Sequence, residues 1–181
     1  MAKRTIGQSV TDRPAAAAHN ITRLMANLAS KDGLERVRAR KTLVLIGEPA
    51  VGHLVKALED KQEWVRWEAA KTLSQIGSPA ATQALIAALE DKMFDVRWLS
   101  AEGLIAIGKE VLVPMFHALV NRPDSSWLRE GVHRVLHGIE DKEFKAIIAP
   151  VIASLEGTNP IEVPLAAEKA LDALGHGGVH Q

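Results

Sequence analysis

The sequence contains no cysteine, no tyrosine and few aromatic residues of any kind. Without cysteine the chain has no disulfide framework, no thiolate nucleophile and no zinc–thiolate site. Aromatic residues, which favour strands, make up only 4% of the chain. The composition therefore argues against a strand-rich fold and against cysteine chemistry.

Long apolar runs are also missing. No stretch approaches the roughly 18 consecutive apolar residues that a membrane-spanning helix needs. Lys3 and Arg4 lie near the N-terminus, but no apolar run follows them, so a secretory signal is not expected. The sequence predicts a cytoplasmic protein that does not contact a membrane.

The chain has no excess of charge of either sign, because 22 basic residues balance 22 acidic ones. The balance is uneven along the chain: residues 1–47 carry nine lysines and arginines against three acidic residues, and the remainder carries thirteen against nineteen. A nucleic-acid-binding protein usually has a stronger and more continuous basic surface. The distribution therefore gives the chain an electrostatic polarity and argues against a nucleic-acid partner.

The residues that are abundant are those of a helical protein. Apolar residues make up 47% of the chain and charged residues 24%, which is ordinary for a globular protein. Alanine and leucine dominate, and both suit close-packed helices. A length of 181 residues suits one domain with a substantial core, so the expected fold is a single all-α domain.

A repeat with an offset of 31 residues runs through the middle of the chain. Residues 54–67 have the sequence LVKALEDKQEWVRW, and residues 85–98 have the sequence LIAALEDKMFDVRW. The same offset relates Leu73 to Leu104 and Gly77 to Gly108, and weaker copies occur at 41–47, 116–129 and 163–175. Internal repetition of this regularity indicates a solenoid of stacked repeats.

Each repeat unit is predicted to form two antiparallel helices. Val65, Ala69 and Leu73 follow helical spacing and define one apolar stripe. Gly77 is expected to end that helix, and Pro79 suits the first turn of the next one. Residues 163–175 repeat the second-helix pattern once more, with Pro164 where an arginine would stand.

The predicted organisation is one repeat domain at residues 13–175, between a disordered tail at 1–12 and a flexible tail at 176–181. The helix pairs are expected at about 14–46, 49–76, 79–107, 110–138 and 142–174.

This pattern resembles the HEAT-repeat family, and within it the short HEAT-like repeats first noticed in phycobilin lyase subunits. The resemblance covers nearly all of residues 20–175 and rests on the turn aspartates, the Val-Arg pairs and the Leu-x-x-Ile-Gly endings. It implies an α-solenoid, HEAT- or armadillo-like, in which aspartates and arginines of successive repeats form a ladder along the stack. The resemblance assigns to this structural ladder Asp60, Arg66, Asp91, Arg97 and Arg129.

All four tryptophans lie at positions where the repeat does not require an aromatic residue. Counting about 100° per residue from Val65, the apolar stripe centres at about 60°, whereas Trp67 lies at about 200° and Trp64 at about 260°. Trp98 takes the Trp67 position in the next repeat, and Trp127 takes the Trp64 position in the fourth. In the family this helix lines the concave surface, so the resemblance implies a shared groove.

Contiguous exposed aromatic residues mark binding sites, and tryptophan and arginine are frequent anchors of protein interfaces. The alternative is that the rings fill gaps between neighbouring helices and are mostly buried. The candidate binding residues are Trp64, Trp67, Lys71, Phe94, Trp98, Leu99, Trp127 and Arg134. The same face is expected to carry a polar rim, or an ordinary solvated surface, made of Arg38, Lys41, Glu63, Glu68, Lys71, Asp95, Glu102, Glu130 and Arg134.

The histidines provide one candidate metal site. His133 and His137 have the i, i+4 spacing of metal ligands on a helix, with Glu130 three residues before His133. The repeat alignment places His133 in the position of Ala70 and Ala101, so a packed histidine is the simpler interpretation. No metal site is predicted.

Other catalytic signatures are missing from the sequence. HEAT-like metal hydroxylases carry His-Glu dipeptides, and no histidine here is followed by glutamate. The chain has no glycine-rich phosphate loop, and its serines lack a nucleophile-elbow context. We therefore expect neither enzymatic activity nor a bound cofactor.

Three function classes remain open. The favoured one is a protein-binding scaffold or adaptor whose aromatic groove holds a helix or an extended peptide of a partner protein. The second is a bilin lyase-type or chaperone subunit, which the resemblance allows although the chain has no nucleophile for covalent transfer. The third is nucleic-acid binding similar to HEAT-like DNA glycosylases, against which the neutral charge argues. The apolar groove also allows a homodimer.

Overall fold

The computed structural model describes residues 12–159 and 161–175, and all regular structure in these residues is helical, which confirms the predicted all-α class. The helices are α1 (Asp12–Leu28), α2 (Gly33–Ile46), α3 (Glu48–Ala57), α4 (Glu63–Ile76), α5 (Thr82–Ala88), α6 (Phe94–Ile107), α7 (Leu112–Asn121), α8 (Ser126–Gly138), α9 (Lys145–Glu156) and α10 (Glu162–Ala173). Short 3-10 turns at Pro79–Ala81 and Lys109–Val111 lead into α5 and α7. The tails predicted at 1–12 and 176–181 lie outside the described residues, except for Asp12, which begins α1.

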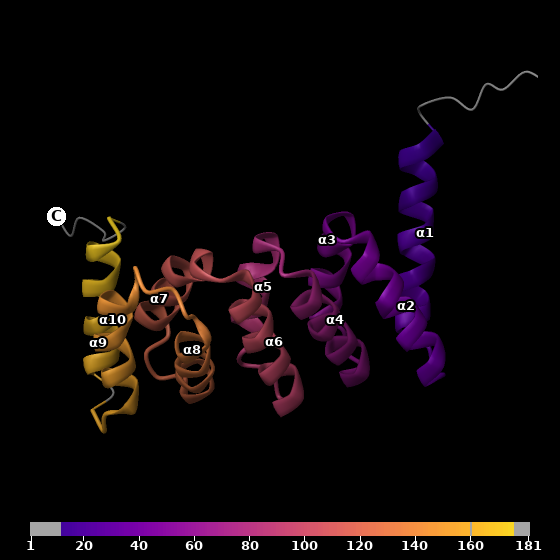
Figure 1. Ribbon diagram of the computed structural model, residues 1–181. Coiled ribbons are helices and arrows are strands. Elements are labelled where there is room, and N and C mark those ends of the chain that lie inside the picture. The colour runs from indigo at the N-terminus through magenta and orange to yellow at the C-terminus, as the bar shows by residue number, and fades with distance from the viewer. Residues whose placement is uncertain (1–11, 160, 176–181) are drawn as a thin grey trace, which may run out of the picture.

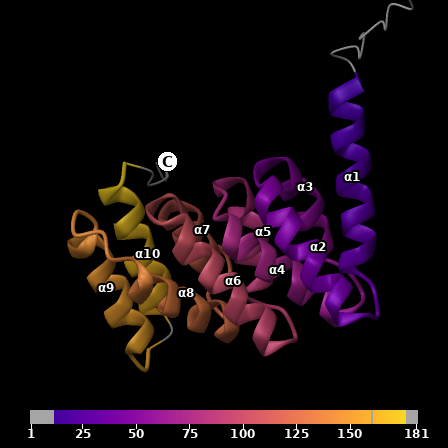
Figure 2. The same ribbon diagram turned by 45° about the vertical axis from the view of Figure 1, so that its right-hand side comes forward.

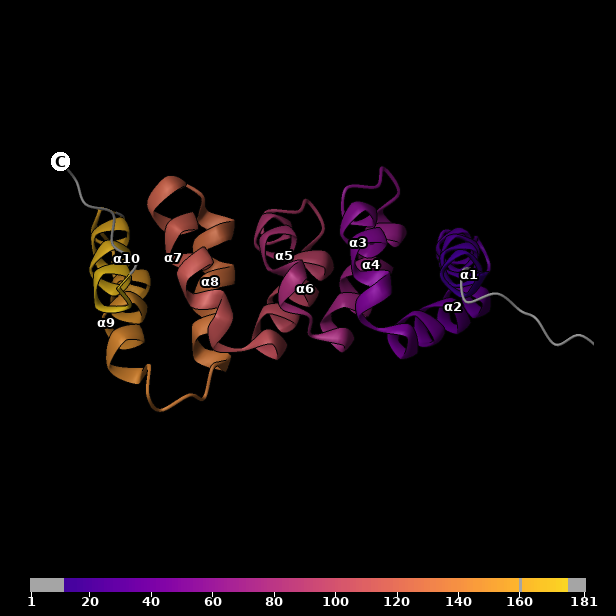
Figure 3. The same ribbon diagram turned by 90° about the horizontal axis from the view of Figure 1, so that it is seen from above.

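The helices stack as a row of pairs (Figure 1), and each pair contributes one helix to each of two layers. Seen from above (Figure 3), α1, α3, α5, α7 and α10 lie along one side of the row, and α2, α4, α6, α8 and α9 lie along the other. In this second layer each helix packs on the next one, from α2 to α9. The helix α1 extends beyond the stack at one end (Figure 2). The described chain is therefore an α-solenoid.

The last pair has its two helices exchanged between the layers. The sequence pattern places residues 163–175 in the second layer, but α10 packs against α7, and it is α9 that packs against α8. That placement was wrong, because an apolar stripe shows that a helix is half-buried without showing which layer it joins. The buried face of α10 includes the small residues Ala167 and Ala170, which allow a close approach to its neighbours.

One continuous apolar core runs between the layers from Ile21 to Leu171. Its largest fully buried side chains come from α1 to α7 and the adjoining turns, and they are Phe116, Leu28, Leu43, Leu54, Leu73, Leu85, Ile86, Leu89, Leu104, Leu112, Met115 and Leu119. Burying one such side chain stabilises the fold by roughly 1.5–3 kcal/mol. Packing between the layers therefore holds the stack together more than the helix propensity of any one segment.

An arginine–aspartate contact links two neighbouring repeats in the middle of the stack. The Arg66 guanidinium donates from Nε to Oδ2 of Asp91 at 2.7 Å and from Nη2 to Oδ1 of Asp91 at 3.1 Å. Its Nη1 also donates to the backbone oxygen of Asp60 at 2.9 Å. The hydrogen bond to Asp91 raises the pKa of Arg66 above its ordinary value. This bidentate contact fixes the spacing of the two repeats.

The ladder implied by the family resemblance does not continue in the same form through Arg97 and Arg129. Arg97 donates to the backbone oxygen of Asp91 at 2.8 Å, as Arg66 does to that of Asp60, but its guanidinium lies against aromatic rings. Arg129 lines a hollow beside α9. In the described residues the arginine–aspartate ladder is therefore represented by the Arg66–Asp91 pair, and the other ion pairs between repeats use glutamates.

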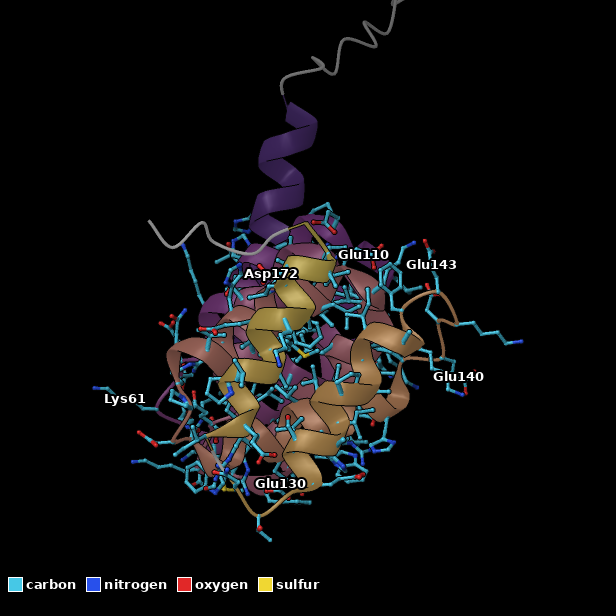
Figure 4. The ribbon with its side chains drawn as sticks, turned by 90° about the vertical axis from the view of Figure 1, so that its left-hand side faces the viewer. Lys61, Glu110, Glu130, Glu140, Glu143 and Asp172 are labelled. Carbon is cyan, nitrogen blue, oxygen red and sulfur yellow. The ribbon has the colours of Figure 1, made fainter. Side chains whose placement is uncertain are left out.

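The turns and connections of the stack occupy its edges. In the view along the stack (Figure 4), Lys61, in the turn between α3 and α4, extends from one edge, and Glu140 and Glu143, between α8 and α9, extend from the opposite edge. The outer faces of the two helix layers are therefore the extended surfaces on which a partner could lie.

In the described residues no single helix is long and apolar enough to cross a membrane. The segments Phe94–Ile107 and Lys109–Asn121 reach that length and composition only together, and they are bent by 114° at the break between them. Their apolar side chains include Leu104 and Phe116, which are buried in the core.

Candidate functional site

Three neighbouring helices of the second layer carry exposed aromatic side chains near their N-terminal ends. These helices, α4, α6 and α8, lie side by side in the stack (Figure 1). Trp64 of α4 is 40% exposed, Phe94 and Trp98 of α6 are 55% and 43% exposed, and Trp127 of α8 is 43% exposed. We call the surface formed by these four side chains the aromatic face.

Trp67 has a different role from the other tryptophans. It is half-buried and packs against the core, and the Arg40 guanidinium from α2 lies 5.5 Å from the centroid of its ring. Trp67 therefore fills a gap between neighbouring helices, whereas the side chains of Trp64, Trp98 and Trp127 are exposed.

Arginine side chains hold the rings of the aromatic face in place. The Arg97 guanidinium lies 4.7 Å from the ring centroid of Trp127 and 5.6 Å from that of Phe94. The Arg134 guanidinium lies 3.1 Å from the ring centroid of Trp98. Each of these cation–π contacts contributes about 0.5–1 kcal/mol at an exposed site. Phe94, Trp98 and Trp127 are therefore held by arginines while each stays partly exposed, and the Trp64 indole N–H donates instead to the backbone oxygen of Ala29 at 3.4 Å.

The Arg134 guanidinium is fixed in turn by Glu102 of α6, because its Nη2 donates to Oε1 of that carboxylate at 2.6 Å. The result is a chain of contacts from Glu102 through Arg134 to the ring of Trp98, which joins α6 to α8. No carboxylate of the described residues lies within ion-pair distance of Arg97, whose guanidinium is held by backbone oxygens and rings.

A hollow of about 190 Å³ opens between α6 and α8 in the middle of the aromatic face. The residues that line it are Phe94, Arg97, Trp98, Ala101, Trp127, Glu130, Gly131, His133 and Arg134. The hollow therefore combines aromatic walls with two guanidinium groups, one carboxylate and one imidazole. Such a lining suits a side chain with an apolar body and a polar end.

Two residues predicted at the surface are buried. Leu99 is 7% exposed and belongs to the core, so it is not part of a binding surface, and Glu68 is 4% exposed. Helices α4 and α6 pack on a neighbour at each side as well as on the first layer, so their buried arc is wider than the single stripe of a helical wheel. Lys71 is half-buried and does not line the hollow.

Glu68 is the centre of a charged cluster between α2 and α4. Nε of Arg36 donates to Oε1 of Glu68 at 3.3 Å, and Nη1 of Arg40 donates to Oε2. A buried carboxylate needs such partners, because an unpaired charge away from water is strongly unfavourable. Glu68 is therefore structural, and Arg40 connects it to the ring of Trp67.

The other predicted rim residues lie at or near the surface. Arg38, Lys41, Glu63, Asp95 and Glu130 are exposed, and Glu102 and Arg134 are half-buried. Acidic and basic groups are mixed on this face, so it has no continuous field of one sign.

His133 does not occupy a packed slot like Ala70 and Ala101. Its Nε2 lies 3.2 Å from Oε1 of Glu156, the last residue of α9, and Nε2 of His137 lies 3.4 Å from the same oxygen. A hydrogen bond with His133, and a weaker effect of the hydrogen bond with His137, lower the pKa of Glu156. The sequence could not predict this cluster, because it depends on the packing of α9 against α8 that the repeat pattern does not indicate.

Comparison with known proteins agrees with this architecture. Residues 21–105 match a family model described as HEAT repeats. No curated protein sequence matches the chain.

Among solved structures, the complex of CpcE and CpcF of phycocyanin lyase from Nostoc sp. PCC7120 contains a similar chain. It has a TM-score of 0.56 and 22% sequence identity, and the match covers 84% of this chain and 98% of that one. An engineered protein matches with a TM-score of 0.47 and 21% identity over 84% of this chain and 78% of its own. At 22% identity the first likeness is one of fold. Residues 21–105 therefore match HEAT repeats, and the fold of the described chain is a HEAT-like stack of helix pairs that continues beyond them.

Proposed function

We propose that this chain is a non-catalytic protein-binding scaffold whose aromatic face holds a segment of a partner protein. The observation that carries the proposal is the row of Trp64, Phe94, Trp98 and Trp127, each 40–55% exposed, on three adjacent helices. Large contiguous apolar surfaces are unfavourable in water and are typical of interaction sites. Outside this row, the exposed large apolar side chains of the described chain are Leu34 and Leu45 on α2, and Ile161 and Leu165 at the start of α10.

The face is organised before a partner arrives. Arg97 and Arg134 stack on three of the rings, and Glu102 holds Arg134. A surface whose side chains are already fixed loses little conformational entropy on binding, which favours affinity. Tryptophan and arginine are also the residue types that most often dominate the binding energy of protein interfaces.

The size of the hollow favours a peptide side chain over a large ring system. Small-molecule sites usually enclose about 300–1,000 Å³, and the hollow between α6 and α8 has about 190 Å³. One aromatic or aliphatic side chain of a bound peptide fills such a space, with its neighbours lying along the row of rings. A polar or acidic group on the same side chain would meet Arg97.

The bilin alternative keeps one observation in its favour, which is the likeness of fold to a chain in the phycocyanin lyase complex. The same complex contains two different proteins, CpcE and CpcF, so the likeness is also compatible with a protein partner. Nucleic-acid binding is supported less well, because Glu63, Asp95 and Glu130 are exposed on this face and would repel phosphates.

The proposal is tested by selecting peptides against the full chain from a displayed library and measuring their affinity by fluorescence anisotropy. The double variant Trp98→Ala/Trp127→Ala is expected to bind a selected peptide at least about 30-fold more weakly, which corresponds to about 2 kcal/mol at an anchor residue. The matched control is Leu45→Ala/Ile161→Ala, which removes two exposed apolar side chains elsewhere and should leave the affinity unchanged.

Unchanged affinity in the tryptophan variant would overturn the proposal, provided that its helical content equals that of the parent chain. An absorbance change on adding a free bilin, lost in the same variant, would instead support the lyase-type or chaperone function. Binding to DNA that falls steeply with added salt would support the nucleic-acid function.

A further inference from the structure

A second constellation, on the adjoining surface of α8 and α9, points to a metal ion. His133 and His137 are one helical turn apart on α8, so both imidazoles extend from the same face of that helix. Glu156 reaches them from the end of α9. One potential ligand atom from each of the three side chains lies within 4.8 Å of the other two. We propose that His133, His137 and Glu156 form a zinc-binding site.

The distances match the coordination geometry of zinc. Ligand atoms that bind zinc tetrahedrally at about 2.0–2.1 Å lie about 3.3 Å from one another. Nε2 of His133 lies 3.2 Å from Oε1 of Glu156, and Nε2 of His137 lies 3.4 Å from it. The ring centroids of the two histidines are 4.5 Å apart in an edge-on arrangement, so both rings lie beside the Glu156 carboxylate. Two of the three distances between ligand atoms therefore already fit a zinc ion, and ligand atoms of the two histidines lie within 4.8 Å of each other.

The donor set selects the kind of metal. Magnesium and calcium prefer oxygen ligands throughout, whereas two imidazoles with one carboxylate are a donor set that zinc uses in proteins. Three protein ligands leave a fourth coordination position for water or for a group of a bound partner. All three side chains are at least one-third exposed, so solvent reaches the site.

The backbone around the cluster also favours a cation. Glu156 is the last residue of α9, and His137 lies in the last turn of α8. The C-terminal end of a helix carries a partial negative charge of roughly half an elementary charge, which stabilises a nearby cation. Two helix ends therefore add to the charge of the Glu156 carboxylate.

The surroundings provide space for the fourth ligand. A hollow of about 590 Å³ lies beside the cluster, and Arg129, Glu130, His133, Glu156 and Thr158 are among the residues that line it. Arg129 and Glu130 are of opposite charge, so the wall as a whole does not repel a cation. In the view along the stack, Glu130 lies at the outer edge of the molecule (Figure 4).

The site is independent of the proposed peptide binding but adjoins it. His133 lines this hollow and also the smaller one in the aromatic face. A zinc ion would fix the His133 ring and thereby one wall of the aromatic hollow. The two inferences rest on different residues, because the binding test uses Trp98 and Trp127 and the metal test uses the histidines and Glu156.

The test is a zinc titration of the metal-free full chain by calorimetry or by competition with a fluorescent chelator. The parent chain is expected to bind one zinc ion at this site, and His133→Ala, His137→Ala and Glu156→Gln are each expected to bind it at least about 100-fold more weakly. Cobalt in place of zinc should give the visible absorption of a four-coordinate ion in the parent chain and lose it in the variants.

The controls are His53→Ala, which removes an exposed histidine of α3, and the double variant His176→Ala/His180→Ala. Both should bind zinc as the parent does. Saturable binding that disappears in either control and persists in the three cluster variants would overturn the proposal. The absence of saturable zinc binding in a parent chain with intact helical content would overturn it as well, and the cluster would then be a hydrogen-bonded trio.

Discussion

At the scale of single residues, the role of a charged or aromatic side chain depends on its neighbours from other helices. The sequence of its own helix does not predict those neighbours. Glu68 and Glu63 lie on the same helix, yet Glu68 is buried between two arginines and Glu63 is exposed. Trp67 and Trp64 differ in the same way. A helical wheel predicts which side chains point away from the first layer, but it does not predict which of them meet the neighbouring repeat.

The Glu68→Ala variant tests the structural role of that carboxylate. We expect it to lower the free energy of unfolding by about 1–3 kcal/mol, because Arg36 and Arg40 lose a charged hydrogen-bond partner while remaining partly open to water. Urea denaturation followed by circular dichroism measures the change. Glu140→Ala, which removes a glutamate that extends into solvent (Figure 4), should change it by less than about 0.5 kcal/mol. Equal effects of the two substitutions would contradict the role assigned to Glu68.

At the scale of helices, the sequence predicts where a helix ends better than it predicts which layer of the stack the helix joins. Gly77 ends α4 in the left-handed conformation, with φ 66° and ψ 28°, as its place after an apolar stripe predicts. The exchange of α9 and α10 between the layers has no such local signal, and neither does the contact between His133 and Glu156 that depends on it. Contacts between helices of different pairs join residues that are far apart in the sequence. A repeat pattern predicts such contacts only where the repeats are regular.

Gly77 at the end of α4 and Gly52 within α3 allow a matched test of local conformation. Gly77→Ala is expected to destabilise the fold by about 1–2 kcal/mol, because a Cβ atom is unfavourable at positive φ. Gly52→Ala is expected to stabilise it by about 0.5–1 kcal/mol, because Gly52 is an exposed residue within α3 and its added Cβ would meet no atom within 4 Å. Chemical denaturation of both variants checks the two signs, and the same sign for both would contradict the conformations described.

At the scale of the whole molecule, the fold is a row of repeats joined by one core. Periodicity and the offset of 31 residues predict the all-α stack, because those features follow from helices that must bury one face against the next repeat. The second-layer surface on α4, α6 and α8 follows from the same regularity. Its detailed chemistry does not, since the stacking of Arg97 and Arg134 on rings of other residues depends on side-chain positions across helices.

The continuity of the core predicts cooperative unfolding. The last pair is joined to the stack by both of its helices, α9 to α8 and α10 to α7. Urea unfolding curves from tryptophan fluorescence, which reports residues 64–127, and from circular dichroism, which reports all helices, are therefore expected to coincide. A loss of helical signal at lower urea concentration than the fluorescence change would show that the last pair unfolds on its own.

The central claim is that the aromatic face is the binding surface, and two-dimensional NMR of the four tryptophan indole N–H groups tests it most directly. The resonances are assigned with single Trp→Phe variants and followed while a selected peptide is added. The account expects large shifts for Trp98 and Trp127, whose rings border the hollow, and a smaller shift for Trp67, which is packed against the core. Saturable peptide binding that leaves Trp64, Trp98 and Trp127 unshifted would contradict it and place the binding surface elsewhere on the solenoid.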